Sequence, residues 1–289
     1  MTAQRRTDLA LEAHELRRAS GRLPGVTTRE RERNGCPVTA VEISSREAAE
    51  ALGKPAGTYV TLDLRGKPST EDAAEAVGAE LRALLGGAAK SALVVGLGND
   101  AMTPDAVGPR AAAHVLVTRH LKQNAAFASF ASVSVLTPGV LGRTGLEAAE
   151  TIRGAVEAAK PDAVIAVDAL ASRSLARLCT TVQLSDTGIV PGSGVGNRRS
   201  AIDRAALGVP VYAVGVPTVV DAATLALDVL EEAGAAFGDP EALRGHEGVL
   251  VTTRDIDARL EALARVVGCG IDLALHPIGY AELCGLMEG

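Results

Sequence analysis

Two aspartates stand where α/β proteins usually carry their chemistry. Asp168 follows the apolar run at 163–167, AVIAV, which is typical of a buried strand. Asp105 lies in the loop GLGNDAMTPDAVGP, which follows a second apolar run at 92–95. Open α/β sheets place their functional side chains just beyond the carboxyl ends of such strands. The sequence therefore predicts that Asp105 and Asp168 face a common cleft.

A pair of carboxylates can divide the acid and base work of hydrolysis. The ionised member takes a proton from water, and the protonated member polarises a carbonyl group. Closeness of two like charges raises one of the two pKa values and produces this division. Either aspartate alone could simply cap a helix or a turn. Because two occur in matching settings, we predict that Asp105 and Asp168 are the catalytic residues.

Polar and glycine residues in the neighbouring loops are predicted to bind substrate or to support the aspartates. The glycine-rich loop at 188–196 can offer backbone N–H groups to an oxyanion or hold an extended peptide. Ser193 stands in G-S-G rather than G-x-S-x-G, and no histidine lies between His120 and His246 to act as its base. It is therefore interpreted as a turn residue, not as a nucleophile. The candidate supporting residues are Asn99, Thr144, Asp186, Gly192, Ser193, Gly194 and Asn197.

A cofactor-dependent function is disfavoured. Residues 96–101 fit the loose dinucleotide pattern G-x-G-x-x-A, which favours a nucleotide-binding oxidoreductase as an alternative. That pattern should enter a helix directly and meet an acidic residue about 20 positions later. Thr103 and Pro104 interrupt the start of the helix, and 106–146 contains no Asp or Glu. Two aspartates could also hold a divalent ion, but no third histidine or cysteine is visible nearby, so neither cofactor nor metal is expected.

Composition narrows the class of protein and its partners. The chain has 289 residues, of which 47% are hydrophobic, so it is globular with a sizeable core. Aromatic residues are 2% and the net charge is −6, which disfavours nucleic acid as a partner. We also expect no signal peptide and no membrane span. Four scattered cysteines without a CxxC pair fit buried thiols in a reducing compartment, so a cytoplasmic location is expected.

Apolar runs alternate with helical patterns along the chain, which predicts an α/β fold with a mostly parallel sheet flanked by helices. We expect strands at 38–43, 59–64, 92–95, 132–136, 163–167, 178–184, 209–214 and 248–251. We expect helices at 70–85, from Pro104 to about Gln123, and at 253–275. Another helix is expected to begin at a capping box of Thr144 and Glu147 and to end at 159, and one more is expected after 217. Residues 234–247 are polar, which predicts a connecting loop on the surface.

The first 35 residues are predicted to form an arm on a single domain at 36–289. Residues 1–34 hold eight arginines and five acids, whereas the rest of the chain is strongly acidic. A basic arm is expected to lie against an acidic body. Apolar spacing within 8–20 predicts a short helix there.

Several long stretches resemble the spore germination protease family of endospore-forming bacteria, peptidase family A25. The likeness is carried by RTDLALEAHEL, GLGNDAMTPDAVGP, TPGVLGRTGLE, PDAVIAVDALASRSLARLCTTVQLSDTGIVPGSGVGN, GVPVYAVGVPTVVDAAT and GIDLALHP. The resemblance implies an endopeptidase that degrades small acid-soluble spore proteins during germination, inside the spore core. It implies a homotetrameric zymogen in which two aspartates are essential. By motif position these match Asp105 in TPDAVGP and Asp168 in AVDALAS. An inactive scaffold that only binds spore proteins is the other alternative, disfavoured because both aspartates are present.

The family is also similar in fold to hydrogenase-maturation peptidases, whose GN…DxxG loop and later strand-end aspartate occupy equivalent places. Those enzymes use a histidine as a third metal-contacting residue, and this chain has none in the corresponding region. In the family the precursor cuts itself within the arm, at a site that matches Asp8 and Leu9. The resemblance thus implies a propeptide of residues 1–8 and a mature chain that begins at Leu9.

Overall fold

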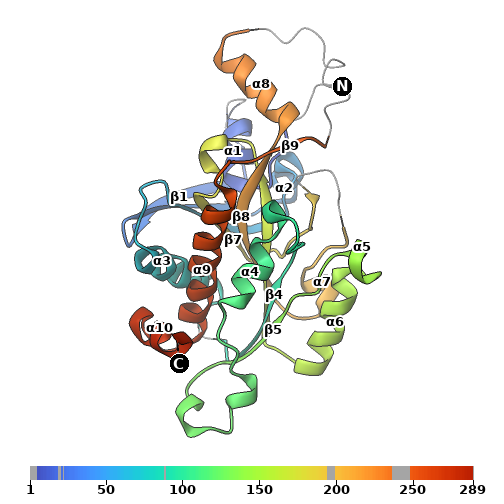
Figure 1. Cartoon of the computed structure of the whole chain (residues 1–289). Coiled ribbons are helices and arrows are strands. Elements are labelled where there is room, and N and C mark those ends of the chain that lie inside the picture. The colour runs from blue at the N-terminus through green and yellow to red at the C-terminus, as the bar shows by residue number, and fades with distance from the viewer. Residues whose placement is uncertain are drawn as a thin grey trace.

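The computed structural model describes residues 5–18, 21, 23–87, 89–193, 199–235 and 248–288. Its centre is a nine-stranded sheet in the order β1-β2-β3-β7-β8-β6-β4-β5, with β9 paired to β8 (Figure 1). The strands are β1 (Val26–Arg33), β2 (Cys36–Ile43), β3 (Gly57–Asp63), β4 (Ser91–Gly96), β5 (Ser132–Leu136), β6 (Ala163–Ser172), β7 (Thr181–Ser185), β8 (Val211–Asp221) and β9 (Leu250–Val251). The α-helices are α1 (Ala10–Arg18), α2 (Arg46–Leu52), α3 (Thr70–Leu84), α4 (Val107–Ala113), α5 (Leu141–Thr144), α6 (Ala148–Ala159), α7 (Arg204–Leu207), α8 (Ala222–Glu232), α9 (Ile256–Leu275) and α10 (Tyr280–Glu288).

The predicted α/β class is confirmed, but the sheet is mixed rather than mostly parallel. Strands β5, β4, β6 and β8 run parallel to one another, as expected for strands joined through helices. Strands β1, β2, β3, β7 and β9 pair antiparallel. The first of these pairs is a hairpin whose two-residue turn is Asn34-Gly35, both with positive φ. That dipeptide is the standard signal for a tight hairpin, so this one antiparallel pair could be predicted from the sequence.

The two faces of the sheet are covered differently. Helices α3, α4 and α9 cover one face and enclose the main core, in which Val182, Val214 and Val267 are fully buried. On the other face, α6 and α7 pack over β4 and β6 at one end. Helices α1 and α2 pack over β2 and β3 at the other end. The second face therefore carries two separate apolar clusters, and the stretch of sheet between them is available for a site.

The N-terminal arm joins the body more closely than the predicted boundary at residue 35 implies. Strand β1 is part of the sheet, so residues 26–33 belong to the folded domain. The predicted short helix is α1, and the arm does lie on acidic groups of the body. Arg5 pairs with Asp228 at 2.7 Å, and Arg6 with Asp221 at 3.8 Å. Opposite charge thus fixes the first described residues of the chain.

Two predicted helices have different bounds. Helix α4 ends at Ala113 rather than near Gln123, because the next N–H groups find other partners. The N–H of Leu116 donates to the buried carboxylate of Asp272, and that of Thr118 donates to Val133 O. Helix α6 begins later than expected: its capping box is formed by Glu147 and Glu150, and Thr144 ends α5.

The remaining structural expectations concern cysteines and membranes. Cys36, Cys179 and Cys269 are buried free thiols, as expected, and Cys284 is half-buried. No single helix among the described residues has the length and apolar character needed to cross a membrane. Helices α9 and α10 pass that test only as a pair bent by 112°. Most of the predicted surface connection at 234–247 lies outside the described residues.

Candidate active site

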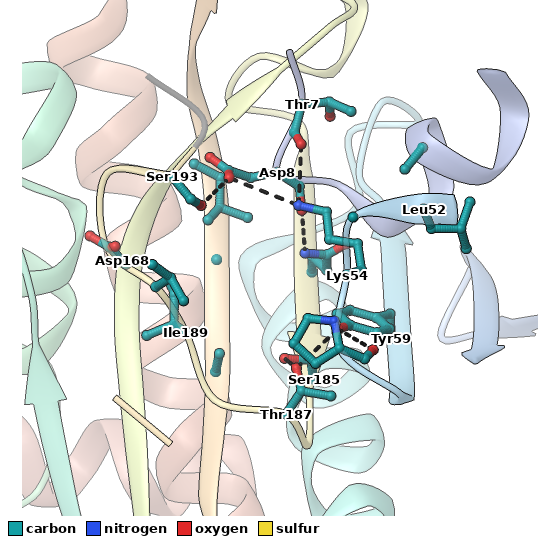
Figure 2. A pocket seen from close by; sticks show the side chains of 18 of the residues that line it. Thr7, Asp8, Leu52, Lys54, Tyr59, Asp168, Ser185, Thr187, Ile189 and Ser193 are labelled. Carbon is teal, nitrogen blue, oxygen red and sulfur yellow. Dashed lines mark hydrogen bonds and ion pairs between the residues drawn. The ribbon is translucent and has the colours of Figure 1, made fainter. Parts of the chain in front are cut away.

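A pocket of about 690 Å³ occupies the open stretch of sheet between the two apolar clusters (Figure 2). Its floor is one face of four neighbouring strands. The floor residues are Tyr59 of β3, Gln183 and Ser185 of β7, Ala213 and Gly215 of β8, and Asp168 and Leu170 of β6. The central strand β8 contributes only small residues, which leaves the face hollow. A Cβ at Gly215 would stand 2.2 Å from the side chain of Leu170, which packs over this glycine.

Asp168 is the most deeply buried acid of this pocket, with 4% of its surface exposed. It does not end its strand as predicted, because β6 continues to Ser172. The edge beside it is nevertheless open, since β4 stops at Gly96, opposite Val167. Burial raises the pKa of Asp168 well above its ordinary value, and the nearby charges of Asp105 and Asp8 raise it further. Asp168 is therefore the better candidate for the protonated member of the pair.

Asp105 ends the 3₁₀ turn at Thr103–Asp105, in the loop after β4. The N–H of Asn99 donates to its carboxylate at 2.8 Å and to its carbonyl oxygen at 3.1 Å. The hydroxyl of Thr218 on β8 donates to Pro104 O at 2.6 Å, which ties the loop to the sheet. Burial raises the pKa of Asp105, and the hydrogen bond from Asn99 lowers it in part. Asp105 is thus the better candidate for the ionised member, and Asn99 contacts it through its backbone N–H.

The loop around Asp105 depends on one glycine, which gives a first prediction. Gly98 has φ +111°, and a Cβ there would lie 2.0 Å from Asp105 O. Gly98→Ala is expected to destabilise the fold by more than about 1 kcal/mol and to displace Asp105. Gly154 in α6 is the control, since a Cβ there meets nothing within 4 Å. Gly154→Ala should be stabilising by about 0.5–1 kcal/mol. Denaturant unfolding measures both, and equal stability of the two variants would contradict the prediction.

The arm enters this pocket at Asp8. Its carboxylate accepts hydrogen bonds from the Ser193 hydroxyl at 2.7 Å and from the Ala171 N–H at 2.9 Å. The ammonium group of Lys54 lies 4.0 Å from it. Figure 2 shows Asp8 held between Ser193 and Lys54, with Asp168 on the Ser193 side of the pocket. The pocket therefore binds an acidic side chain through a hydroxyl, a backbone amide and a cation.

The peptide bond between Asp8 and Leu9 is also fixed. Its carbonyl oxygen accepts a hydrogen bond from Gln183 Nε2 at 3.3 Å, and its N–H donates to Thr7 Oγ1 at 3.0 Å. The N–H of Asp8 donates to Ala171 O at 2.8 Å. Leu9 is fully buried, and α1 begins directly after it. The segment is therefore held by hydrogen bonds on both sides of a bend at Asp8, up to the residue where the helix starts.

The other predicted site residues divide into three groups. Gly192 and Ser193 line the pocket. Asp186 and Thr144 do not: Asp186 is exposed and accepts from the Thr58 N–H at 2.8 Å, and the Thr144 hydroxyl bonds within its own turn. Gly194 and Asn197 lie outside the described residues.

Sequence reasoning missed Lys54 and Gln183. Gln183 carried a detectable signal, because a glutamine on the polar side of the run TVQLS faces the same way as Ser185. Lys54 follows a short helix and carried none. Among the residues that the structure describes, no three His, Cys, Asp or Glu side chains are grouped to share a metal ion.

The sequence and the fold were compared with those of known proteins. The family model for germination protease matches residues 4–242. Germination proteases are similar over 94% of this chain, with 43% identity in Caldanaerobacter subterraneus subsp. tengcongensis, 39% in Clostridium perfringens and 36% in Bacillus cytotoxicus. The alignments cover 94%, 95% and 93% of those relatives. Among solved structures, the [NiFe] hydrogenase maturation protease HycI from Thermococcus kodakarensis matches 66% of this chain and 98% of its own, at 19% identity and a TM-score of 0.38.

Proposed function

The chain belongs to the germination protease family, and on that basis we propose that it is an endopeptidase that starts the degradation of small acid-soluble spore proteins during germination. One observation carries this proposal beyond the family assignment. The acidic residue Asp8 of the chain's own arm is bound in the pocket that Asp168 lines. An acid followed by an apolar residue is the kind of site expected in the spore proteins, so the arm acts as a tethered substrate.

The two aspartates carry the reaction in this proposal. Asp105, ionised, takes a proton from water, and the water oxygen bonds to the carbonyl carbon of the substrate. Asp168, protonated, gives its proton to the carbonyl oxygen, which forms a neutral diol. As the C–N bond breaks, Asp105 returns its proton to the leaving nitrogen and one hydroxyl returns a proton to Asp168. One water is consumed, and both aspartates regain their starting states.

Occupation of this pocket by Asp8 supports the proposal that the chain is made as an inactive precursor. While Asp8 occupies the acid-binding position, no other acidic residue can bind there. Leu9 is buried, so removal of residues 1–8 requires the arm to shift before cleavage. We further propose the homotetrameric zymogen that the family resemblance implies, activated by cleavage between Asp8 and Leu9.

Ser193 is predicted to set the preference for an acid at the cleavage point. In a chain that begins at Leu9, Ser193→Ala should raise KM for an Asp-Leu peptide by about 10-fold, since a hydrogen bond to a charged group contributes about 1.5–3 kcal/mol. The kcat should change little, because the bond is present before and during the reaction. An Asn-Leu peptide is the control, and Ser193→Ala should affect it less. Equal losses on both peptides would rule out carboxylate recognition by Ser193.

The activity itself is tested by incubating the purified chain that begins at Leu9 with purified small acid-soluble spore proteins. The expected result is a few defined fragments, each produced by a cut after an acidic residue. Mass spectrometry identifies the cut positions. Spore proteins that remain intact, or cuts unrelated to acidic residues, would contradict the proposal.

A further inference from the structure

Gln183 contacts the arm on both sides of its acidic cleavage position. Its Nε2 donates to Asp8 O at 3.3 Å, and its Oε1 accepts from the Ala10 N–H at 2.7 Å. The second bond fixes which way the amide group points, because only the oxygen can accept from an N–H. The Gln183 side chain is therefore oriented with its N–H groups toward the carbonyl of the peptide bond between Asp8 and Leu9.

Strand register places Gln183 in the same row as Asp168. Gly215 of β8 pairs with Asp168 on one side and with Gln183 on the other. Residues paired across neighbouring strands point to the same face, and two strand spacings correspond to about 10 Å. Both side chains therefore project from the same face of the sheet, and the side chain of Leu170 packs over Gly215 between their rows. A peptide bound above this row can be approached by both.

Burial strengthens the hydrogen bond that Gln183 donates. Only 7% of Gln183 is exposed, and a donor in such a site is not competing with bulk water. Its neighbours on the same face of β7 are Thr181 and Ser185, so this side of the strand is polar over its whole length. Packing of α1 alone would be served by an apolar residue, as it is at Val41 and Tyr59 in the same cluster.

We propose that Gln183 is a catalytic residue whose Nε2–H binds the carbonyl oxygen at the cleavage point and stabilises the negative charge that develops there. The proposal rests on the peptidase function proposed above. As the water oxygen bonds to the carbonyl carbon, the π electrons of the C=O bond move onto the carbonyl oxygen. A carbonyl oxygen has two lone pairs, so it can accept from Gln183 while it takes the proton of Asp168. Gln183 gives up no proton and is unchanged at the end.

Two substitutions separate this role from a structural one. Gln183→Met keeps the length of the side chain and removes both polar atoms. Gln183→Glu keeps an acceptor for the Ala10 N–H but has no donor while it is ionised. In the full chain, both should slow cleavage between Asp8 and Leu9 at pH 7 by about 10²–10³-fold, the loss typical of one oxyanion donor. Gln123→Met is the matched control, because Gln123 is exposed and outside the pocket, and it should cleave at the normal rate.

The pH profile supplies a readout that a structural role would not move. A glutamate at this buried position should have a raised pKa, and its protonated form is again an O–H donor. As pH falls, Gln183→Glu should therefore recover activity relative to the unsubstituted chain, whereas Gln183→Met should not. For an added Asp-Leu peptide, the kcat of each variant relative to that of the unsubstituted chain should change with pH in the same way, with KM nearly unchanged. Thermal unfolding checks that both variants are folded.

The possible outcomes distinguish this proposal from the proposed function. Slow cleavage by both variants with acid recovery of the glutamate variant supports the donor role. Normal cleavage by a folded Gln183→Met chain overturns the role of Gln183 and leaves the peptidase proposal standing. Equal losses in the two variants at every pH, or a loss confined to KM, also overturn it. An unsubstituted chain that cuts neither its arm nor the peptide overturns both proposals.

Discussion

Replacing Asp168 with asparagine is expected to reduce peptide cleavage by about 10²–10⁴-fold while the chain stays folded. Asparagine has nearly the same shape but cannot give up and recover a proton. Asp105→Asn is expected to have an effect of the same size, because the ionised member of the pair is equally necessary. Cleavage of an added Asp-Leu peptide by the chain that begins at Leu9 measures both rates. The control is Asp186→Asn, an exposed aspartate outside the pocket, which should leave the rate unchanged.

Stability should change in the opposite direction from activity. The pKa of Asp168 is raised in the folded protein, so folding favours its protonated form. The folded state is therefore penalised as pH rises above about 4, where this carboxyl group ionises in the unfolded chain. Asparagine carries no such penalty, so Asp168→Asn should unfold at a higher temperature than the unsubstituted chain at pH 7. The difference should shrink as pH falls towards about 4.

These two measurements together test the assignment of Asp168. An inactive variant that is as stable as, or more stable than, the original identifies a group kept for chemistry at the expense of stability. A variant that loses activity because it unfolds would show that Asp168 is structural. A folded variant that retains most of its activity would remove Asp168 from the proposed mechanism. The same comparison applies to Asp105, whose pKa is raised by burial.

The aspartate pair could be predicted because it depends on local patterns that the fold preserves. An apolar run that ends near a polar residue reports a buried strand, and strands of one sheet bring their ends together. Asp105 and Asp168 needed no more than that. The glycine-rich loop that contains Ser193 was predicted from its composition, and its described part lines the pocket. Its serine, however, binds the carboxylate of Asp8, a contact between residues 185 positions apart.

The rest of the pocket depends on pairings that one sequence does not specify. Gln183 lies in the same row as Asp168 only because β7 pairs with β8 in this register, and nothing in 178–185 indicates which strand is its neighbour or in which direction that strand runs. Lys54 depends on how α2 packs against α1. Asp186 was expected in the cleft because it follows a strand, but β7 runs antiparallel to β8, so its end lies at the opposite edge from Asp168. The assumption of a mostly parallel sheet was therefore the source of that misplacement.

Under mild acid the full chain is expected to cut itself between Asp8 and Leu9, leaving a product that begins at Leu9. The bond is already bound in the pocket that Asp168 lines, but ion pairs hold the arm in place. Arg5 pairs with Asp228, and Arg177 pairs with Glu15 at 2.8 Å. Loss of these ion pairs releases the arm, so that its peptide bond can move against the aspartates.

The two catalytic groups set the limits of the pH range. Asp168 must be protonated, and because its pKa is raised, lowering the pH increases the population of its protonated form. Asp105 must be ionised, so the rate should fall again once the pH drops below its own, less strongly raised pKa. Self-cleavage should therefore rise as pH falls from 7, pass through a maximum, and decline in stronger acid. Mass spectrometry of samples held across that range measures both the rate and the position of the cut.

Two controls decide whether the chain cuts itself at a recognised site. Asp168→Asn should give no product that begins at Leu9 at any pH. Asp8→Asn removes the carboxylate bound by Ser193 and Ala171 but keeps the side chain's shape, so it should slow the cut by about 10-fold or more. Ragged ends, or the same product from Asp168→Asn, would instead indicate clipping of an exposed terminus by another protease. Because Leu9 is fully buried in the intact chain, such clipping should be confined to the residues before it.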